Sequence, residues 1–215
     1  MSASEPLKLA LPKGRLFDQT VEFLKVRGMS FQFGKRELVA TDREHNVQLM
    51  IVKNSDLPVY VHHGIAGLGV VGTDVIYESG HSFFELFTFP FGGTRICLAG
   101  KEEELLPGAA REAVTVATKF TRFTRDFFHQ RGVPVEIIKL NGSVELAPVL
   151  GLAPFIVDLV ETGSTLKAHN LTVLQELAVT EVRLIANKPY YKYHFRRIEE
   201  LLRQLKQQGS DEHND

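Results

Sequence analysis

The sequence has a single cysteine, no excess of charge of either sign and no long apolar run, and each absence excludes a class of protein. Cys97 alone can form neither an intramolecular disulfide nor a thiolate metal site, so a reducing compartment, the cytoplasm, is expected, with Cys97 as a small core residue. The 25 Lys and Arg residues against 26 Asp and Glu residues do not indicate a nucleic-acid partner. No run of about eighteen apolar residues exists, so no membrane-spanning helix is expected.

Three further signals are missing. The N-terminal segment MSASEPLKLALPKGRLF is interrupted by Lys8 and Pro12 and lacks the long apolar stretch of a signal peptide, so export is not expected. None of the eight histidines forms a His-x-x-x-His pair, so no zinc site is expected. Ser143 has no base and acid at triad-like positions, which leaves a serine nucleophile without support.

Short apolar runs alternate with amphipathic segments along the chain. Strands are predicted over residues 7–11, 47–52, 68–71, 85–89, 95–99, 114–117, 135–140, 156–160, 172–178 and 182–186. Helices are predicted over residues 16–27, 56–63, 121–130 and 190–208, with others starting near Thr73 and Ser143. This order predicts an α/β protein with a mostly parallel, buried sheet, organised as two α/β units.

The segment VDLVETGSTLKAHNL, residues 157–171, changes abruptly from a buried-strand pattern to small polar residues. A strand, a tight glycine-containing loop and a helix N-terminus present free N–H groups and partial positive charge to an anion. The hydroxyls of Thr162, Ser164 and Thr165 add donors. No Gly-Lys-Ser/Thr sequence follows, so a phosphate monoester such as a sugar 5-phosphate fits better than nucleotide β and γ phosphates. The alternative is a helix cap and tight turn without a ligand.

Carboxylates surround this loop. Asp158 and Glu161 flank it, and Glu145 lies upstream in NGSVELAPVLGLAP. Such groups indicate ribose hydroxyls or Mg²⁺ next to the phosphate. Asp158 also interrupts an apolar strand near the carboxyl end of a parallel sheet, where open α/β sheets bind ligands; the alternative is an exposed edge carboxylate.

The segment LPKGRLF offers a second candidate anion site, because Lys13 and Arg15 flank Gly14 at a strand-to-helix turn. Arg provides a planar fork and Lys a point charge, a combination that suits a polyphosphate. Arg36 and Lys53 are candidates for the same site. The alternative for each is an ordinary solvated surface cation.

A formal match to the dinucleotide fingerprint, GLGVVG over residues 67–72, is rejected. Its glycines interrupt the strand instead of following it, and residues 91–93 stand where a ribose-binding acid is required. The following Thr73 and Asp74 open a helix and are either cap residues or ligand groups.

These motifs together resemble the short form of the ATP phosphoribosyltransferase family. The resemblance rests on LPKGRL, SDLPVYVHHGIAGLGVVGTDV, VATKFTRFTRDFF and, most specifically, NGSVELAPVLGLAPFIVDLVETGSTL over residues 141–166. The signature positions are Glu145, Gly151, Ala153, Ile156, Asp158, Thr162, Gly163, Thr165 and Leu166. The resemblance implies a pentosyltransferase that moves the phosphoribosyl group of PRPP to N1 of ATP, with release of pyrophosphate, in the first step of histidine biosynthesis.

The resemblance also implies a fold, in which two α/β domains with a cleft between them adopt a periplasmic-binding-protein-like (type II) arrangement with a double chain crossover. Domain I would comprise residues 1–94 and 182–215, including a returning C-terminal helix, and domain II, residues 95–181, would bind PRPP. The active site would lie in the cleft.

Roles for individual residues follow from the resemblance in three groups. The PRPP-binding group comprises Asp158, Glu161, Thr162, Gly163, Ser164 and Thr165, the last four at the 5-phosphate. The ATP-binding group comprises Gly14, Asp74, Thr118 and Glu145, although Glu145, like Asp158, would face either ribose hydroxyls or adenine. The catalytic group, whose charges face polyphosphate, comprises Lys13, Arg15, Arg36 and Lys53. No metal ligand from the protein is implied, since Mg²⁺ is carried by the substrate phosphates.

The sequence departs from the family pattern at several positions. Lys53 stands in place of Arg, which keeps the charge but loses the fork. Gly67 and Pro154 each stand in place of Asp, and Thr121 and Arg122 replace Pro-Asn. These departures put the pyrophosphate contact of Lys53 and any assignment in the 121–122 loop in question.

The resemblance finally implies partners. The chain ends soon after the returning helix, without the regulatory domain of the long form, so a histidyl-tRNA-synthetase-like regulatory subunit is implied, in a hetero-octamer with catalytic homodimers. No nucleic acid and no membrane is expected as a partner. Two other functions remain open from the residues alone: a small-anion receptor with the same fold, and a phosphoribosyltransferase with another nitrogen nucleophile.

Overall fold

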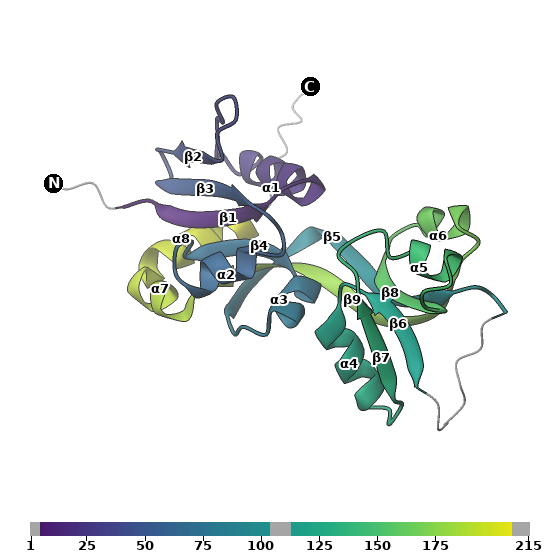
Figure 1. The fold of residues 1–215 in the computed structure, drawn as a ribbon. Helices are drawn as coiled ribbons and strands as arrows, with labels where there is room; N and C mark the ends of the chain where they lie inside the picture. The colour runs from purple at the N-terminus through teal and green to yellow at the C-terminus, as the bar shows by residue number, and fades with distance from the viewer. Residues whose placement is uncertain (1–4, 104–112, 208–215) are drawn as a thin grey trace. The chain divides into compact units, whose positions relative to one another are not determined.

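The computed structural model describes residues 5–103 and 113–207, and the chain divides into two compact units (Figure 1). Unit 1 comprises Met1–Gly92 and Val182–Asp215, and unit 2 comprises Gly93–Glu181. The chain passes from one unit to the other twice, in strand β5 (Phe84–Gly100) and in strand β9 (Thr172–Ala186). Unit 1 is therefore built from two separate stretches of sequence, whereas unit 2 is one continuous stretch.

Unit 1 is a sheet with the strand order β2-β3-β1-β4-β9-β5. Its further strands are β1 (Leu7–Pro12), β2 (Val39–Asp42), β3 (Val47–Val52) and β4 (Leu68–Gly72). Its helices are α1 (Arg15–Lys25), α2 (Leu57–His62), α3 (Thr73–Ser79), α7 (Lys188–Tyr193) and α8 (Phe195–Lys206). Strand β1 runs parallel to β3 and β4, so the carboxyl ends of these three strands share one edge of the sheet.

The central strands β1, β4 and β9 of the unit 1 sheet are buried on both faces, as successive residues that point to opposite sides show. Leu184 lies in a core formed with α1 and α8, and the next residue, Ile185, lies in the core under α2. The apolar stripe of α8 supplies Ile198, Leu201, Leu202 and Leu205 to the first of these cores. A sheet covered on both faces explains why its strands are continuous apolar runs instead of alternating ones.

Unit 2 has the strand order β9-β5-β8-β6-β7. Its further elements are β6 (Val114–Thr118), β7 (Val135–Lys139), β8 (Phe155–Val160), α4 (Thr121–His129), α5 (Leu146–Val149) and α6 (Ser164–Ala168). Strand β6 runs parallel to β7 and β8. Ile156 and Cys97 face the core that contains Leu166 of α6, and Val157 faces the core that contains Phe128 of α4. The glycine-containing loop between β8 and α6, identified in the sequence, lies on the α5 and α6 side of this sheet.

The alternation of strands and helices is confirmed, but two predicted breaks are wrong. The strands predicted over 85–89 and 95–99 form the single strand β5, and those over 172–178 and 182–186 form the single strand β9. The sheet is mixed: β2 runs antiparallel to β3, β9 to β4 and β5 to β8, whereas the pairs β1–β3, β1–β4, β6–β7 and β6–β8 are parallel, as predicted. Glycine inside β5 permits close strand contact: a Cβ at Gly92 would lie 2.8 Å from Val182 Cγ2.

Smaller differences concern the helices and one strand. Strand β2 was not predicted, and the helix expected from Ser143 is the single turn α5. The helix predicted over 190–208 is two helices, α7 and α8, that meet at His194; residue 208 itself lies outside the described residues. Within residues 5–103 and 113–207, no helix is long and apolar enough to cross a membrane.

The ring of Tyr190 leaves no room for a side chain at residue 67. The ring of Tyr190 lies against the Gly67 backbone, and a Cβ added at Gly67 would overlap ring atoms. The Tyr190 hydroxyl also accepts a hydrogen bond from the Lys8 N–H at 3.1 Å, which fixes the ring against β1. The acidic residue expected at position 67 from the family pattern is therefore incompatible with Tyr190 in this place.

Gly67→Ala is expected to lower the free energy of unfolding by about 1–3 kcal/mol, the cost of overpacking a filled site. Urea denaturation followed by far-ultraviolet circular dichroism measures this change. In a Tyr190→Ala background the same Gly67→Ala substitution should cost little, because the ring is gone. An equal cost in both backgrounds would mean that the penalty comes from the backbone and not from the ring.

Candidate active site

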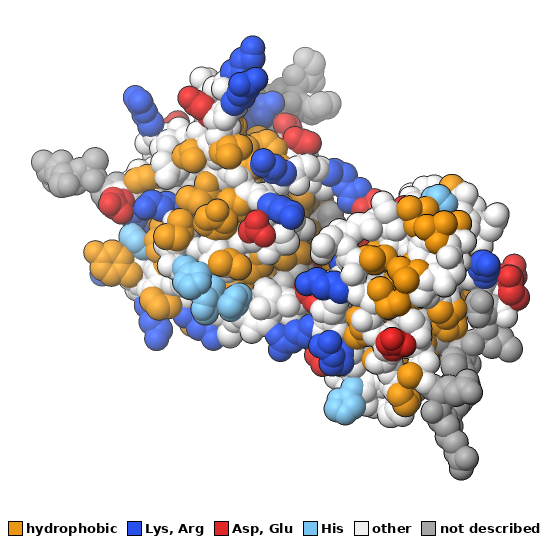
Figure 2. Space-filling view, viewed as in Figure 1, with side chains coloured by type: hydrophobic (Ala, Val, Ile, Leu, Met, Phe, Trp, Pro, Cys, Tyr) orange, Lys and Arg blue, Asp and Glu red, His pale blue; other side chains and the backbone are white. Residues whose placement is uncertain are grey.

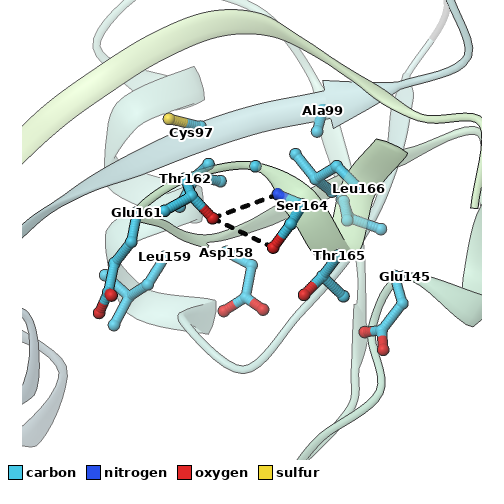
Figure 3. A pocket seen from close by; sticks show the side chains of 13 residues that line it. Cys97, Ala99, Glu145, Asp158, Leu159, Glu161, Thr162, Ser164, Thr165 and Leu166 are labelled. Carbon is cyan, nitrogen blue, oxygen red and sulfur yellow. Dashed lines mark hydrogen bonds between the residues drawn. The ribbon is translucent and has the colours of Figure 1, made fainter. Parts of the chain in front are cut away.

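The residues predicted to bind PRPP gather around one pocket in unit 2, with a volume of ≈ 310 Å³ (Figure 3). The predicted residues that line it are Glu145, Asp158, Glu161, Thr162, Gly163, Ser164 and Thr165. Strand β8, the loop after it and the start of α6 provide most of the wall, and Cys97 and Ala99 of β5 contribute from the neighbouring strand. The pocket thus lies at the carboxyl end of β8.

The loop after β8 owes its shape to Gly163. This residue has φ 74° and ψ 7°, the left-handed conformation that glycine adopts without strain, and it precedes the first residue of α6. Thr162 Oγ1 accepts a hydrogen bond from the Ser164 N–H at 3.4 Å and lies 3.1 Å from Ser164 Oγ. The hydroxyl groups of Thr162 and Ser164 therefore stand side by side at the exposed mouth of the pocket, as Figure 3 shows.

Asp158 forms an ion pair that sequence analysis missed. The Lys119 Nζ lies 3.3 Å from Asp158 Oδ1. A signal for this pair existed, because Lys119 lies two residues after the predicted strand of residues 114–117. Parallel pairing of β6 with β8 sets Thr118 against Val157, hence Lys119 next to Asp158. From sequence alone, the register between these two strands was unknown.

Thr118 was assigned to ATP, but its hydroxyl is engaged with the backbone. Thr118 is fully buried; its Oγ1 donates to the Val157 carbonyl at 2.6 Å and accepts from the Phe120 N–H at 2.9 Å. Thr118 is not among the residues that line the pocket. Its side chain ties the end of β6 to β8 and shapes the turn into α4.

Thr118→Val is expected to destabilise the protein by about 1–3 kcal/mol, because the buried Phe120 N–H and Val157 carbonyl lose a partner without a change in shape. Thr124→Val is the matched control, since the Thr124 hydroxyl is buried in the same unit and makes no hydrogen bond. Thermal denaturation of both variants should show a lower Tm for Thr118→Val only. Equal melting temperatures would contradict the assigned role.

The cationic residues predicted from the sequence lie in unit 1, at the carboxyl edge of its sheet. Lys13 and Lys53 directly follow β1 and β3, and the Lys13 N–H donates to the Val52 carbonyl at 3.0 Å. Gly14, with φ 96°, leads into α1, whose first residue is Arg15, and both cations of this turn are exposed. The structure therefore brings the backbones of Lys13, Arg15 and Lys53 to one edge.

Two other predicted residues flank this edge. Arg36 is exposed and has φ 69°, in the loop that leads to β2; Leu38, two residues on, accepts a hydrogen bond from the Ile51 N–H near the end of β3. Asp74, in the first turn of α3, is 9% exposed and folds back over Gly72, where a Cβ would overlap its carboxylate. Gly72 ends β4, the parallel neighbour of β1, so Asp74 also lies at the carboxyl edge.

The chemistry available in the unit 2 pocket is that of acceptors and hydroxyl donors. Burial raises the pKa of the Cys97 thiol, so this side chain is neutral and serves as an apolar wall, as expected from the sequence. Within the described part of the chain, no three or more His, Cys, Asp or Glu side chains are grouped so that they could hold a metal ion. The side chains that line the pocket are therefore suited to binding and orienting a substrate through hydrogen bonds.

Two α/β units joined by two strands define a protein with the fold of periplasmic binding proteins. The aliphatic sulphonate binding protein SsuA from Escherichia coli superimposes with a TM-score of 0.63 at 14% identity, covering 94% of this chain and 72% of that protein. A putative L-cystine ABC transporter from Listeria monocytogenes gives a TM-score of 0.62 at 14% identity, covering 94% and 90%. At such low identity, these similarities establish the fold alone.

Sequence comparison defines the family. The family model HisG, ATP phosphoribosyltransferase, matches residues 53–207. The ATP phosphoribosyltransferase of Aquifex aeolicus is 41% identical over 208 residues, covering 95% of this chain and 96% of that protein, and that of Thermoanaerobacter pseudethanolicus is 40% identical over 206 residues, covering 94% and 96%. A solved ATP phosphoribosyl transferase (HisG:HisZ) complex from Thermotoga maritima gives a TM-score of 0.82 at 35% identity, covering 93% and 96%.

The chain therefore belongs to the ATP phosphoribosyltransferase family, and its near full-length match to these relatives is that of the short form. It is a pentosyltransferase that acts in the first step of histidine biosynthesis. This finding confirms the family, the fold and the enzymatic activity expected from the sequence.

Proposed function

We propose that the unit 2 pocket binds the 5-phosphate and ribose of PRPP, and that the cations at the carboxyl edge of unit 1 bind polyphosphate during transfer to N1 of ATP. One observation carries the first part: every residue that the sequence assigned to PRPP lines the same pocket. The reaction is that of the family. The geometry of each unit supports the assignment of PRPP to unit 2 and of polyphosphate to unit 1.

The 5-phosphate binds in the loop of residues 162–165. The left-handed Gly163 leads the backbone into α6, where the Ser164 N–H donates to Thr162 Oγ1 at 3.4 Å. The exposed hydroxyls of Thr162 and Ser164, 3.1 Å apart, provide donors for phosphate oxygens. Thr165, one residue on, lines the pocket with its own hydroxyl. Such a loop matches a phosphate monoester, whose oxygens accept several hydrogen bonds at once.

The ribose binds next to the phosphate, against the carboxylates of the pocket. Asp158 and Glu145 line it from strand β8 and from the start of α5, and Glu161 lies at its rim. Ionised carboxylates are acceptors only, so they suit the 2- and 3-hydroxyl donors of a ribose. Their position fixes the direction in which C1 of the sugar points.

Transfer requires that the C1–O bond to pyrophosphate breaks while a bond from adenine N1 to C1 forms. Adenine N1 carries its own lone pair, so no general base is needed, and the protein contributes positioning and stabilisation of growing negative charge. Lys13, Arg15, Arg36 and Lys53 provide that positive charge. Gly14 and Asp74, at the same sheet edge, bind ATP.

Mg²⁺ would be carried into the site by the substrate phosphates. This ion keeps several waters and is usually held by one or two carboxylates together with phosphates, and Glu145 would offer such an oxygen beside the proposed phosphate site. When bound, Mg²⁺ neutralises charge on the pyrophosphate leaving group.

We also propose that the chain works in the cytoplasm, as a catalytic homodimer that assembles with a histidyl-tRNA-synthetase-like regulatory subunit into a hetero-octamer. The solved Thermotoga maritima relative is a HisG:HisZ complex. Apolar patches are visible on the surface of both units (Figure 2), and the exposed large apolar side chains include Ile65, Leu150, Leu152 and Tyr193. Surfaces of this kind are typical of protein interfaces.

The reaction and the site are tested together with purified protein, Mg²⁺, PRPP and ATP, by the ultraviolet absorbance of phosphoribosyl-ATP. Pyrophosphatase pulls the reaction forward, and the regulatory subunit is added in a parallel sample. Product is expected with ATP and not with GTP or free adenine. Full activity of a folded variant with a negatively charged loop would refute the proposed phosphate site but not the activity.

A further inference from the structure

Lys119 is held in place by its two neighbours. Thr118 before it is tied to β8 through the Val157 carbonyl, and its own carbonyl accepts the Leu140 N–H at 3.0 Å. Phe120 after it is 3% exposed and donates its N–H to Thr118 Oγ1. The Lys119 Nζ lies 4.8 Å from the centre of the Phe120 ring, so an aromatic face also supports the ammonium group.

The two oxygens of Asp158 are in different environments. Oδ1 is buried, makes no hydrogen bond and has the Lys119 Nζ at 3.3 Å. The Asp158 side chain as a whole is 28% exposed and lines the pocket, so Oδ2 is the carboxylate oxygen left to a ligand. Lys119 itself is not among the pocket-lining residues. Lys119 therefore influences the pocket through its ion pair with Asp158.

The pocket needs such a counter-charge. Three carboxylates, Glu145, Asp158 and Glu161, line a space of ≈ 310 Å³, and among the described residues no Lys or Arg lines it with them. An unbalanced Asp158 would repel an anionic substrate, and its carboxylate would be free to rotate. The Lys119 ammonium group next to Oδ1 prevents both effects, because it offsets the negative charge of Asp158 and fixes the plane of its carboxylate.

We propose that Lys119 is a positioning residue: it holds Oδ1 of Asp158 so that Oδ2 accepts a ribose hydroxyl of PRPP. The proposal rests on the assignment of Asp158 to the ribose, made above. Because Lys119 improves the binding of the ribose equally before and during transfer, its loss affects KM for PRPP and leaves kcat nearly unchanged.

The test compares Lys119→Met, Lys119→Arg, Asp158→Asn and the double variant Lys119→Met/Asp158→Asn by steady-state kinetics with PRPP varied. Lys119→Met should raise KM for PRPP about tenfold, the effect of one charge-assisted contact, and Lys119→Arg should restore most of it. The double variant should match Asp158→Asn alone, because Lys119 acts only through Asp158. Lys139→Met is the control: Lys139 ends the neighbouring strand β7, opposite Thr118, and is exposed.

The outcomes separate the two assignments. An unchanged KM in Lys119→Met, or additive effects in the double variant, would overturn the role of Lys119 while leaving Asp158 in the site. An unchanged KM in Asp158→Asn would remove Asp158 from the ribose site, and the proposal for Lys119 with it. A drop in kcat alone, without a change in KM, would show that Lys119 acts on the transition state and not on substrate positioning.

Discussion

The Thr162→Asp variant is expected to lose nearly all phosphoribosyl transfer at ordinary PRPP concentrations. The substitution replaces a donor hydroxyl in the loop after β8 with a carboxylate, which would face the 5-phosphate. Juxtaposed like charges cost several kcal/mol, so KM for PRPP should rise by about 10²–10³-fold. Thr162 is exposed, so the variant should fold normally. Initial rates of phosphoribosyl-ATP formation against PRPP concentration measure the effect.

Thr162→Val separates charge from the loss of the hydroxyl. It keeps the shape and removes one hydrogen bond, so KM should rise by only about tenfold. High ionic strength should narrow the difference between the two variants, because it screens exposed charges. If Thr162→Asp bound PRPP as tightly as the parent protein, the loop of residues 162–165 would not be the 5-phosphate site.

Arg15→Ala is expected to lower kcat by about two to three orders of magnitude, the loss associated with one preorganised group that stabilises developing charge. Arg15 is the first residue of α1 and is exposed at the carboxyl edge of the unit 1 sheet, beside Lys13. In the proposed site, its planar fork would bind two phosphate oxygens at once. Steady-state kinetics with both substrates saturating measures the change.

Two further variants make this test specific. Arg15→Lys keeps the charge without the fork and should recover part of kcat. Lys25→Ala removes a cation from the last turn of the same helix, where Lys25 pairs with Glu22 at 3.6 Å, and should leave kcat unchanged. A normal rate in a folded Arg15→Ala protein would exclude Arg15 from the site.

Local sequence signals were sufficient to predict the loop of residues 162–165. The change from apolar residues to ETGST depends only on neighbours in the chain, and strand β8, the Gly163 turn and helix α6 follow in that order. The pocket around them was predictable for the same reason, since Asp158 and Glu161 belong to the same segment. Among the predicted residues that line the pocket, only Glu145 comes from another element, and the family signature supplied it.

Long-range pairing was not predictable from the sequence. Strand β5 contains Pro90, Gly92 and Gly93, which normally mark a turn, but pairing with neighbouring strands continues the strand through them, with Gly92 at φ 72°. Lys119 was missed for a related reason, because its partner is fixed by the register of β6 against β8 and not by any local motif. The same register places the Thr118 hydroxyl against the Val157 carbonyl, to which it donates a hydrogen bond. The sequence motif alone suggested that this hydroxyl could bind a ligand.

The two passages of the chain between the units also set an order of events during synthesis. All residues of unit 2 leave the ribosome before the second stretch of unit 1 does, so unit 2 can fold while unit 1 is still incomplete. Unit 1 cannot close its core until Ile198, Leu201, Leu202 and Leu205 of α8 arrive. A nascent chain halted before α8 would therefore carry a folded unit 2 and an incomplete unit 1. The apolar sheet face of unit 1 that α8 covers would be exposed to solvent until translation resumes.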